Sequence, residues 1–138
     1  MAEFERIAKL MNPPFMKLLG IEAVAIAAGR VVTRVVVRDE LRQQDGFVHA
    51  GVAATMADHS AGGAAATLMR EDQTPLTVEF KLNLLRPAVG RALVCESEVL
   101  KAGKTLSVAE SAVFAEDDQG DRKLIAKAIV TLAVVALP

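Results

Sequence analysis

The feature that most constrains the fold is an apolar, Ala-rich segment that runs from about His49 to Met69. It is too long and too rich in alanine for a strand, so we expect a helix, with a bend or frayed turns near Gly62 and Gly63. A helix that is apolar on nearly every side has to be buried. The other elements of the chain are therefore expected to wrap around one central helix.

Asp58 is the one acidic residue in this segment, and the nearest others are Asp45 and Glu71. A carboxylate in such surroundings is costly to bury unless it is hydrogen-bonded, paired with a charge, or placed where a ligand needs it. Asp58 is therefore the first candidate for a functional side chain. The structural alternative is an acid bonded to nearby N–H or hydroxyl groups, or a polar contact that specifies a dimer interface.

The length and charge of the chain limit the classes of protein that fit. Its 138 residues favour a single domain spanning 1–138. Sixteen basic and seventeen acidic residues give a net charge of -1 without a basic cluster, so neither nucleic acid nor a membrane is expected as a partner. The lone Cys95 excludes an intrachain disulfide, and no segment of signal-peptide type opens the chain, so a cytoplasmic location is expected.

The segments before the central helix predict a short helix and a hairpin. Residues 4–11 place apolar side chains at helical spacing, and this helix must end before the Pro-Pro pair that begins at Pro13. The chain is then expected to be extended, with β-rich runs at 20–28 and 31–38 separated by a Gly-Arg turn. The second run alternates along its length, which predicts one buried face.

Four strand-like runs follow the helix, at 76–84, 91–101, 104–116 and 122–136. In the first run, apolar residues alternate with polar ones, and turn residues separate the later runs, so an antiparallel meander is expected. The predicted fold class is α+β, with a curved antiparallel sheet of about six strands around one long helix and a short N-terminal helix.

The segment that leads into the helix carries the most specific motif. Residues 46–51 read GFVHAG, and Asp58 lies nine residues after His49. Weaker motifs in a matching order are LGI at 19–21, TVEF at 77–80, LRPA at 85–88 and KAGK at 101–104. Over nearly its whole length, the chain resembles the hotdog-fold acyl-CoA thioesterases of the phenylacetate-degradation (PaaI-like) type.

The resemblance implies an enzyme that hydrolyses an acyl- or aroyl-CoA thioester to the free acid and CoA, without a cofactor. Backbone N–H groups at the helix start would polarise the thioester carbonyl, because free donors and the helix dipole favour negative charge there. Ala50 holds that position, with Gly51 beside it. The family motif has glycine where this chain has Ala50, but a backbone donor survives that change unless the turn needs a positive φ. Asp58 would either activate water or attack the thioester carbon.

The spacing of these groups implies more than one subunit. Eight residues of helix from Ala50 to Asp58 span about 12 Å, whereas a reacting carbon must lie about 3 Å from both groups. One helix cannot serve one carbonyl with both. The helix start of one subunit is therefore expected to meet Asp58 of another, in a homodimer with two equivalent sites. Whether dimers associate further into a homotetramer is left open.

Four other residues have roles implied by the resemblance. Gln43 matches a position whose amide donates to the carbonyl or holds water. A surface loop residue is the alternative for Gln43, and the adjacent Gln44 leaves the register open. Thr77 resembles the Ser or Thr that positions water in the aspartate-bearing branch of the family. Lys104 and Thr105 resemble a position at the entrance for CoA.

Structural roles are expected for several other reactive side chains. His49 is either a general base or, in keeping with its place at the helix entrance, a cap. His59 points about 100° around the helix from Asp58, so the two are not expected to work as a pair. The spacing of the two histidines predicts no metal site. Cys95 is expected to be a core thiol, and Arg86 a structural residue near a strand end.

The sequence leaves two alternatives to a thioesterase. A hydratase or dehydratase of the same fold would pair His with an acid in a different motif, which is not found. A non-catalytic acyl-CoA-binding protein or sensor is the second alternative, and thiol release separates it from an enzyme. The scarcity of aromatic residues favours an aliphatic acyl group, although the many small residues could also make room for a ring.

Overall fold

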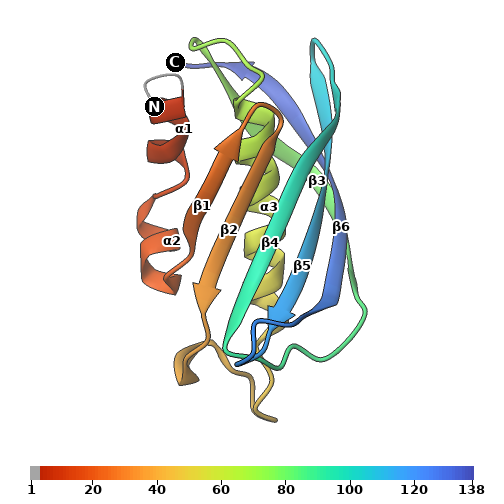
Figure 1. Ribbon diagram of the computed structural model, residues 1–138. Helices are drawn as coiled ribbons and strands as arrows, with labels where there is room; N and C mark the ends of the chain where they lie inside the picture. The colour runs from red at the N-terminus through yellow and green to blue at the C-terminus, as the bar shows by residue number, and fades with distance from the viewer. Residues whose placement is uncertain (1–3) are drawn as a thin grey trace.

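The computed structural model describes residues 4–138 and consists of one six-stranded antiparallel sheet wrapped around the helix α3 (Figure 1). The elements are α1 (Glu5–Leu10), α2 (Pro14–Leu19), β1 (Glu22–Ala27), β2 (Arg30–Val36), η2 (Asp39–Leu41), α3 (Ala50–Ala66), β3 (Gln73–Leu84), β4 (Ala92–Ala102), β5 (Leu106–Glu116) and β6 (Arg122–Ala136). The predicted α+β hotdog fold is confirmed. Within residues 4–138, no helix is long and apolar enough to cross a membrane.

The N-terminal region contains two short helices where the sequence predicted one helix followed by extended chain. Pro14 is the first residue of α2, a position where its fixed φ and missing N–H are tolerated. The Pro-Pro pair therefore ends α1 and also begins α2. Gly20 ends α2 in the left-handed conformation, with φ of 81°, and β1 starts two residues later.

The order of the strands is β1-β2-β4-β5-β6-β3, so the predicted meander of four strands is wrong for β3. Strands β4, β5 and β6 do follow one another, but β3 pairs with β6 at the far edge of the sheet. The connection through residues 85–91 carries the chain from that edge back to β4, which pairs with β2. A connection of this length is too long for a tight hairpin and can cross the sheet.

Helix α3 packs closely against the sheet and against α1. Its buried side chains are small or flexible, and they are Val52, Ala53, Met56, Ala57, Ser60, Ala61, Ala64, Ala65 and Ala66. The helix runs without a break through Gly62 and Gly63 and ends at Ala66, before the predicted end at Met69. A Cβ on Gly63 would overlap the sulfur of Met11, which shows that this glycine lets α1 approach.

A row of buried polar side chains joins α3 to the strands beneath it. Thr33 and Ser60 are hydrogen-bonded at 2.8 Å, and Ser97 and Ser111 at 2.6 Å. The Ser111 hydroxyl also donates to the carbonyl of Ala57, at 2.7 Å, next to Asp58 in the chain. Such satisfied buried bonds fix the rotation of the helix over the sheet.

Cys95 lies in the same layer, fully buried, and its thiol contacts the carbonyl oxygen of Met56 at 3.6 Å. Burial raises the pKa of the Cys95 thiol, because desolvation disfavours the thiolate. The prediction of a core thiol is confirmed.

Candidate active site

Asp58 is half-buried on the side of α3 that faces β3, and it is hydrogen-bonded there. The Thr77 hydroxyl donates to Oδ1 of Asp58 at 2.6 Å. This bond joins two residues that the sequence analysis names as candidate catalytic residues. One oxygen of the carboxylate is thereby oriented, and the other keeps its capacity to accept a proton or contact a substrate.

A β-bulge in β3 gives Thr77 this orientation. The pairing of β3 with β6 shifts register between Thr77 and Glu79, which leaves Val78 as the extra residue. Beyond the bulge, Phe80 contacts the same hollow as Asp58. The regular alternation predicted for residues 76–84 is therefore wrong, because the bulge exchanges the two faces of the strand.

The hollow beside Asp58 has a volume of about 340 Å³. Its other lining residues come from α2 and the proline before it, from α3 and from β3, and they are Pro13, Phe15, Met16, Ala54, Thr55, His59 and Phe80. The Nε2–H group of His59 is directed at the carbonyl of Leu10, at 3.1 Å, so His59 ties α1 to α3. In the described part of the chain, His59 and Asp58 each bond to another residue and not to one another, as expected.

The N-terminus of α3 contains a second group of candidate residues. His49 is the N-cap, and its Nδ1 accepts the Gly51 N–H at 2.8 Å. The Val52 N–H is bound by the carbonyl of His49. Within the described residues, the Ala50 N–H has no such acceptor, so it is the free donor at this helix start.

These bonds bear on the roles of Gly51 and His49, which the sequence leaves open. Gly51 cannot share the role of donor in this arrangement, because its N–H is already bound by His49. His49 acts as a cap, and the acceptor role of Nδ1 places the proton of a neutral imidazole on Nε2. The interpretation of His49 as a general base loses support.

Gln43 lies in the turn before α3 and is anchored by its own loop. Its Oε1 accepts the N–H groups of Asp45 at 2.6 Å and of Phe47 at 3.2 Å. Because the carbonyl end is used in the turn, the Nε2 end is left to donate. Gln44 bonds instead to the neighbouring Asp45 carboxylate on the surface. The geometry therefore favours Gln43 over Gln44.

The residues around the helix start line a hollow of about 410 Å³ that does not include Asp58. Its lining residues are Gln43, Gln44, Phe47, Val48, His49, Ala50, Ala53, Leu84, Arg86, Pro87, Ala88 and Ile125. The carboxylate and the free N–H thus belong to different hollows of one chain. Each hollow contains only part of the chemistry that the sequence predicted.

The remaining candidates lie apart from both groups. Lys104 and Thr105 are in the turn between β4 and β5, at the end of the sheet opposite the start of α3 (Figure 1). Their role at a CoA entrance stays a prediction. Arg86 donates to the carbonyl of Leu124 at 2.7 Å, as a structural residue would.

Among residues 4–138, no cluster of three or more His, Cys, Asp or Glu side chains could hold a metal ion.

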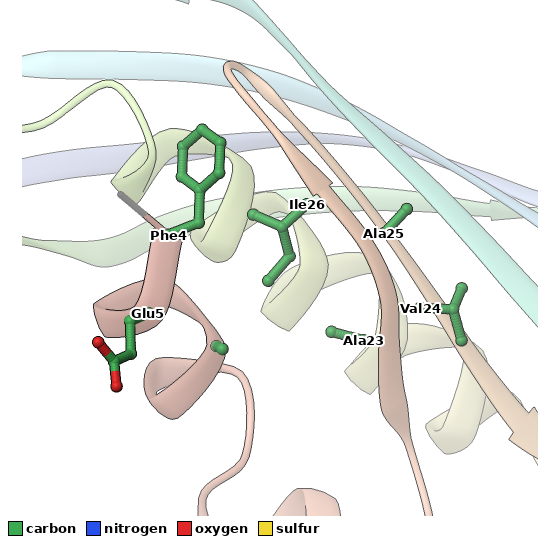
Figure 2. Close-up of a pocket in the computed structure, with 7 residues that line it drawn as sticks. Phe4, Glu5, Ala23, Val24, Ala25 and Ile26 are labelled. Carbon is green, nitrogen blue, oxygen red and sulfur yellow. The ribbon is translucent and has the colours of Figure 1, made fainter. Parts of the chain in front are cut away.

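A third hollow, of about 580 Å³, lies between α1 and β1 (Figure 2). Ala23 and Ile26 point from β1 toward the helix, whereas the Glu5 carboxylate points away from the strand. Among residues 4–138, Glu5 is the one titratable side chain that lines it. The described lining therefore contains no pair of groups suited to acid–base or nucleophilic chemistry.

His59 gives the folded chain a specific response to pH. Burial lowers the pKa of His59 below the usual 6.5, and this outweighs the opposing effects of the Leu10 carbonyl and Asp58. The unfolded state then binds the proton more readily, so stability is complete above about pH 6.5 and falls as the pH drops below that value. In His59→Gln, which keeps a donor for Leu10, we expect a smaller loss of unfolding free energy between pH 7 and pH 5. Urea denaturation at several pH values in this range measures the unfolding free energy of both proteins. If that free energy changes with pH by the same amount in His59→Gln and in the wild type, the prediction is contradicted.

Comparisons with known proteins agree with this geometry. The family described as "Thioesterase superfamily" matches residues 45–121, which include Asp58, Thr77 and the start of α3 but not Gln43. A 1,4-dihydroxy-2-naphthoyl-CoA hydrolase from Listeria monocytogenes is 28% identical over 116 residues, covering 84% of this chain and 91% of the relative.

Solved structures show the same similarity. A thioesterase family protein from Silicibacter pomeroyi has a TM-score of 0.88 and 38% identity, covering 99% of this chain and 95% of that one. A conserved protein from Pseudomonas aeruginosa has a TM-score of 0.83 and 29% identity, covering 92% and 98% of the two chains. The expectation of a thioester hydrolase is confirmed at the level of the family. The chain belongs to the thioesterase superfamily.

Proposed function

We propose that the protein hydrolyses an acyl- or aroyl-CoA thioester to the free acid and CoA, at sites shared between two copies of the chain. The relative from Listeria monocytogenes, named as a hydrolase of an aroyl-CoA, supports a CoA thioester as substrate. The pairing of Asp58 with Thr77, and the free N–H of Ala50, support the chemistry. No cofactor is required for this reaction.

Each of these residues has a separate role in hydrolysis. The Ala50 N–H, at the positive end of α3, stabilises the negative charge that develops on the thioester oxygen. Asp58 either removes a proton from water that attacks the carbonyl carbon, or attacks that carbon itself to form an anhydride that water then opens. In both routes the C–S bond breaks, CoA leaves as the thiol after gaining a proton, and the acid is released. Gln43 Nε2 donates to the carbonyl or to water.

The observation that carries the proposal is the separation of Asp58 from Ala50. They lie eight residues apart on one unbroken helix and line different hollows. This separation of about 12 Å along the helix is too large for one reacting carbon, which needs both groups within about 3 Å. A second copy related by a two-fold axis can supply the missing half to each site.

Strand β3 supplies a surface for that second copy. It is an edge strand, and Leu76 and Val78 on it are 58% and 59% exposed. Long apolar edge strands are prone to pair with another chain. Thr77, which bonds to Asp58, lies between these two residues. At the opposite edge, α1 runs beside β1 (Figures 1 and 2). We therefore place the dimer interface along β3.

Thiol release tests this function. Purified protein is mixed with a panel of acyl- and aroyl-CoA thioesters, free thiol is followed, and binding is measured in parallel. We expect turnover on at least one of them. A folded protein that binds these thioesters but releases no thiol from any would be a binding protein or sensor instead.

A further inference from the structure

A layer of buried polar side chains lies between α3 and the strands β2, β4 and β5 (Figure 1). Its members are at most 1% exposed, and they are Thr33, Ser60, Cys95, Ser97 and Ser111. Buried hydroxyl groups cost free energy unless they are hydrogen-bonded, and within residues 4–138 each of these has a partner. The surrounding core is apolar, so hydroxyl groups are not needed to fill the space. Because hydrogen bonds are directional, this layer can hold α3 in one orientation.

The bonds of Ser97 and Ser111 have a defined direction. Ser111 donates its one hydroxyl proton to the carbonyl of Ala57, at 2.7 Å. In the pair of serines, whose oxygens are 2.6 Å apart, Ser97 must therefore be the donor. The two serines form an ordered chain that ends at a backbone carbonyl of α3. Ser97 thus orients the hydroxyl of Ser111, and Ser111 holds the helix.

The bonds from this layer reach one turn of α3. Within the part of the chain that the structure describes, they fall on the carbonyls of Met56 and Ala57 and on the hydroxyl of Ser60. Asp58 lies in the middle of this turn. The polar layer therefore holds the part of the helix that carries the proposed catalytic carboxylate.

The position of Asp58 depends on the rotation of α3. The Thr77 bond to Oδ1 orients the carboxylate, but it does not fix the helix, because both partners are side chains. A rotation of about 10° moves a side chain that lies about 5–6 Å from the helix axis by about 1 Å. A misplacement of that size costs a reaction about 100-fold in rate. Since the proposed site also uses a donor from the second copy, each α3 has to keep its rotation over its own sheet.

We propose that Ser111, oriented by Ser97, is a positioning residue for Asp58. Its bond to the Ala57 carbonyl keeps the turn that contains Asp58 in the rotation that hydrolysis requires. This inference rests on the proposed function and adds to it the buried residues that place its carboxylate. Both serines are buried beneath the helix, so neither touches the substrate.

The test compares kcat and KM of Ser111→Ala and Ser107→Ala on a thioester that the wild type hydrolyses. Ser111→Ala is expected to lower kcat about tenfold and to change KM less than about twofold, because the lost hydroxyl does not bind substrate. Ser107→Ala is the matched control. Ser107 lies on the same face of β5 and is 2% exposed, but within residues 4–138 it is not part of the bonded layer. Its variant should keep both constants within about twofold of the wild type.

A double-mutant cycle shows whether Ser111 acts through Asp58. Ser111→Ala should cost about tenfold in kcat in the wild type but less than about twofold in the Asp58→Asn background. A general weakening of the fold would lower kcat by the same factor in both backgrounds. Ser97→Ala keeps the bond to Ala57 but removes the donor to Ser111, and it should cost about threefold with the same dependence on Asp58. This variant carries the test if Ser111→Ala does not fold.

The outcomes separate this inference from the proposed function. Circular dichroism at the assay temperature checks that each variant is folded. Wild-type kcat in a folded Ser111→Ala, together with a large loss in Asp58→Asn, would overturn the positioning role and leave the thioesterase intact. Equal losses from Ser111→Ala in both backgrounds would do the same. A wild type that releases no thiol from any thioester would overturn the proposed function, and this inference with it.

Discussion

Asp58→Asn is expected to lower kcat for thioester hydrolysis by about a thousandfold, with a much smaller change in KM. Asparagine has nearly the same shape and can still accept the Thr77 hydrogen bond, but it can neither take a proton from water nor attack the carbonyl carbon. Thiol release under saturating thioester measures the loss, and circular dichroism checks the fold. The matched control is Asp72→Asn, because Asp72 is exposed, pairs with Arg70 and lines neither hollow of the site. Full turnover by Asp58→Asn would exclude Asp58 as the catalytic acid or base.

Ala50→Pro is expected to lower kcat by about 100-fold or more, because it removes the one N–H assigned to the thioester oxygen. The change is compatible with the helix, since proline is tolerated at the first helical residue. His49 before it is already extended, with φ of -60° and ψ of 137°, as a residue that precedes proline should be. Ala50 is also exposed, which leaves room for the ring.

Ala50→Gly is the matched comparison for this prediction. It alters the same position, removes the Cβ and keeps the N–H, so its loss should be far smaller than that of Ala50→Pro. Thermal unfolding of both variants shows whether the helix start is intact. Equal activity of a folded Ala50→Pro and the wild type would mean that another group binds the oxygen.

The sequence predicted the central helix, the hairpin and the later strands because each has a strong local signal. The length of the Ala-rich segment, the alternation in residues 31–38 and the turn glycines are all local properties. The partner of β3 is not local. It depends on how residues 85–91 cross the sheet, and no pattern within one strand encodes that.

The sequence predicted which residue types belong to the site better than it predicted the hydrogen bonds that these residues make. Asp58 and Thr77 were both selected from the sequence, and they are hydrogen-bonded at 2.6 Å. The bulge at Val78 that turns Thr77 toward the helix carries no evident local signal. Nor could the sequence show that His49 occupies the Gly51 N–H, because capping depends on a side-chain orientation.

Phe15 was missed for a related reason. The Pro-Pro pair predicts the end of a helix, and the sequence therefore predicts extended chain after it. Pro at the first position of a helix is a known start signal, and it could have placed Phe15 on α2. Two of the five phenylalanines line the hollow of Asp58, a placement that no local pattern in the sequence shows.

The central claim is that each site takes Asp58 from one subunit and the Ala50 N–H from the other. Mixing Asp58→Asn with Ala50→Pro, by unfolding and refolding the two together, tests it directly. In a mixed dimer one site then contains both intact groups, and the other contains both changes. With random pairing, half of the dimers are mixed and each has one working site, so about a quarter of the wild-type activity should return. If the mixture stays as inactive as the two variants alone, although mixed dimers form, the shared site is contradicted.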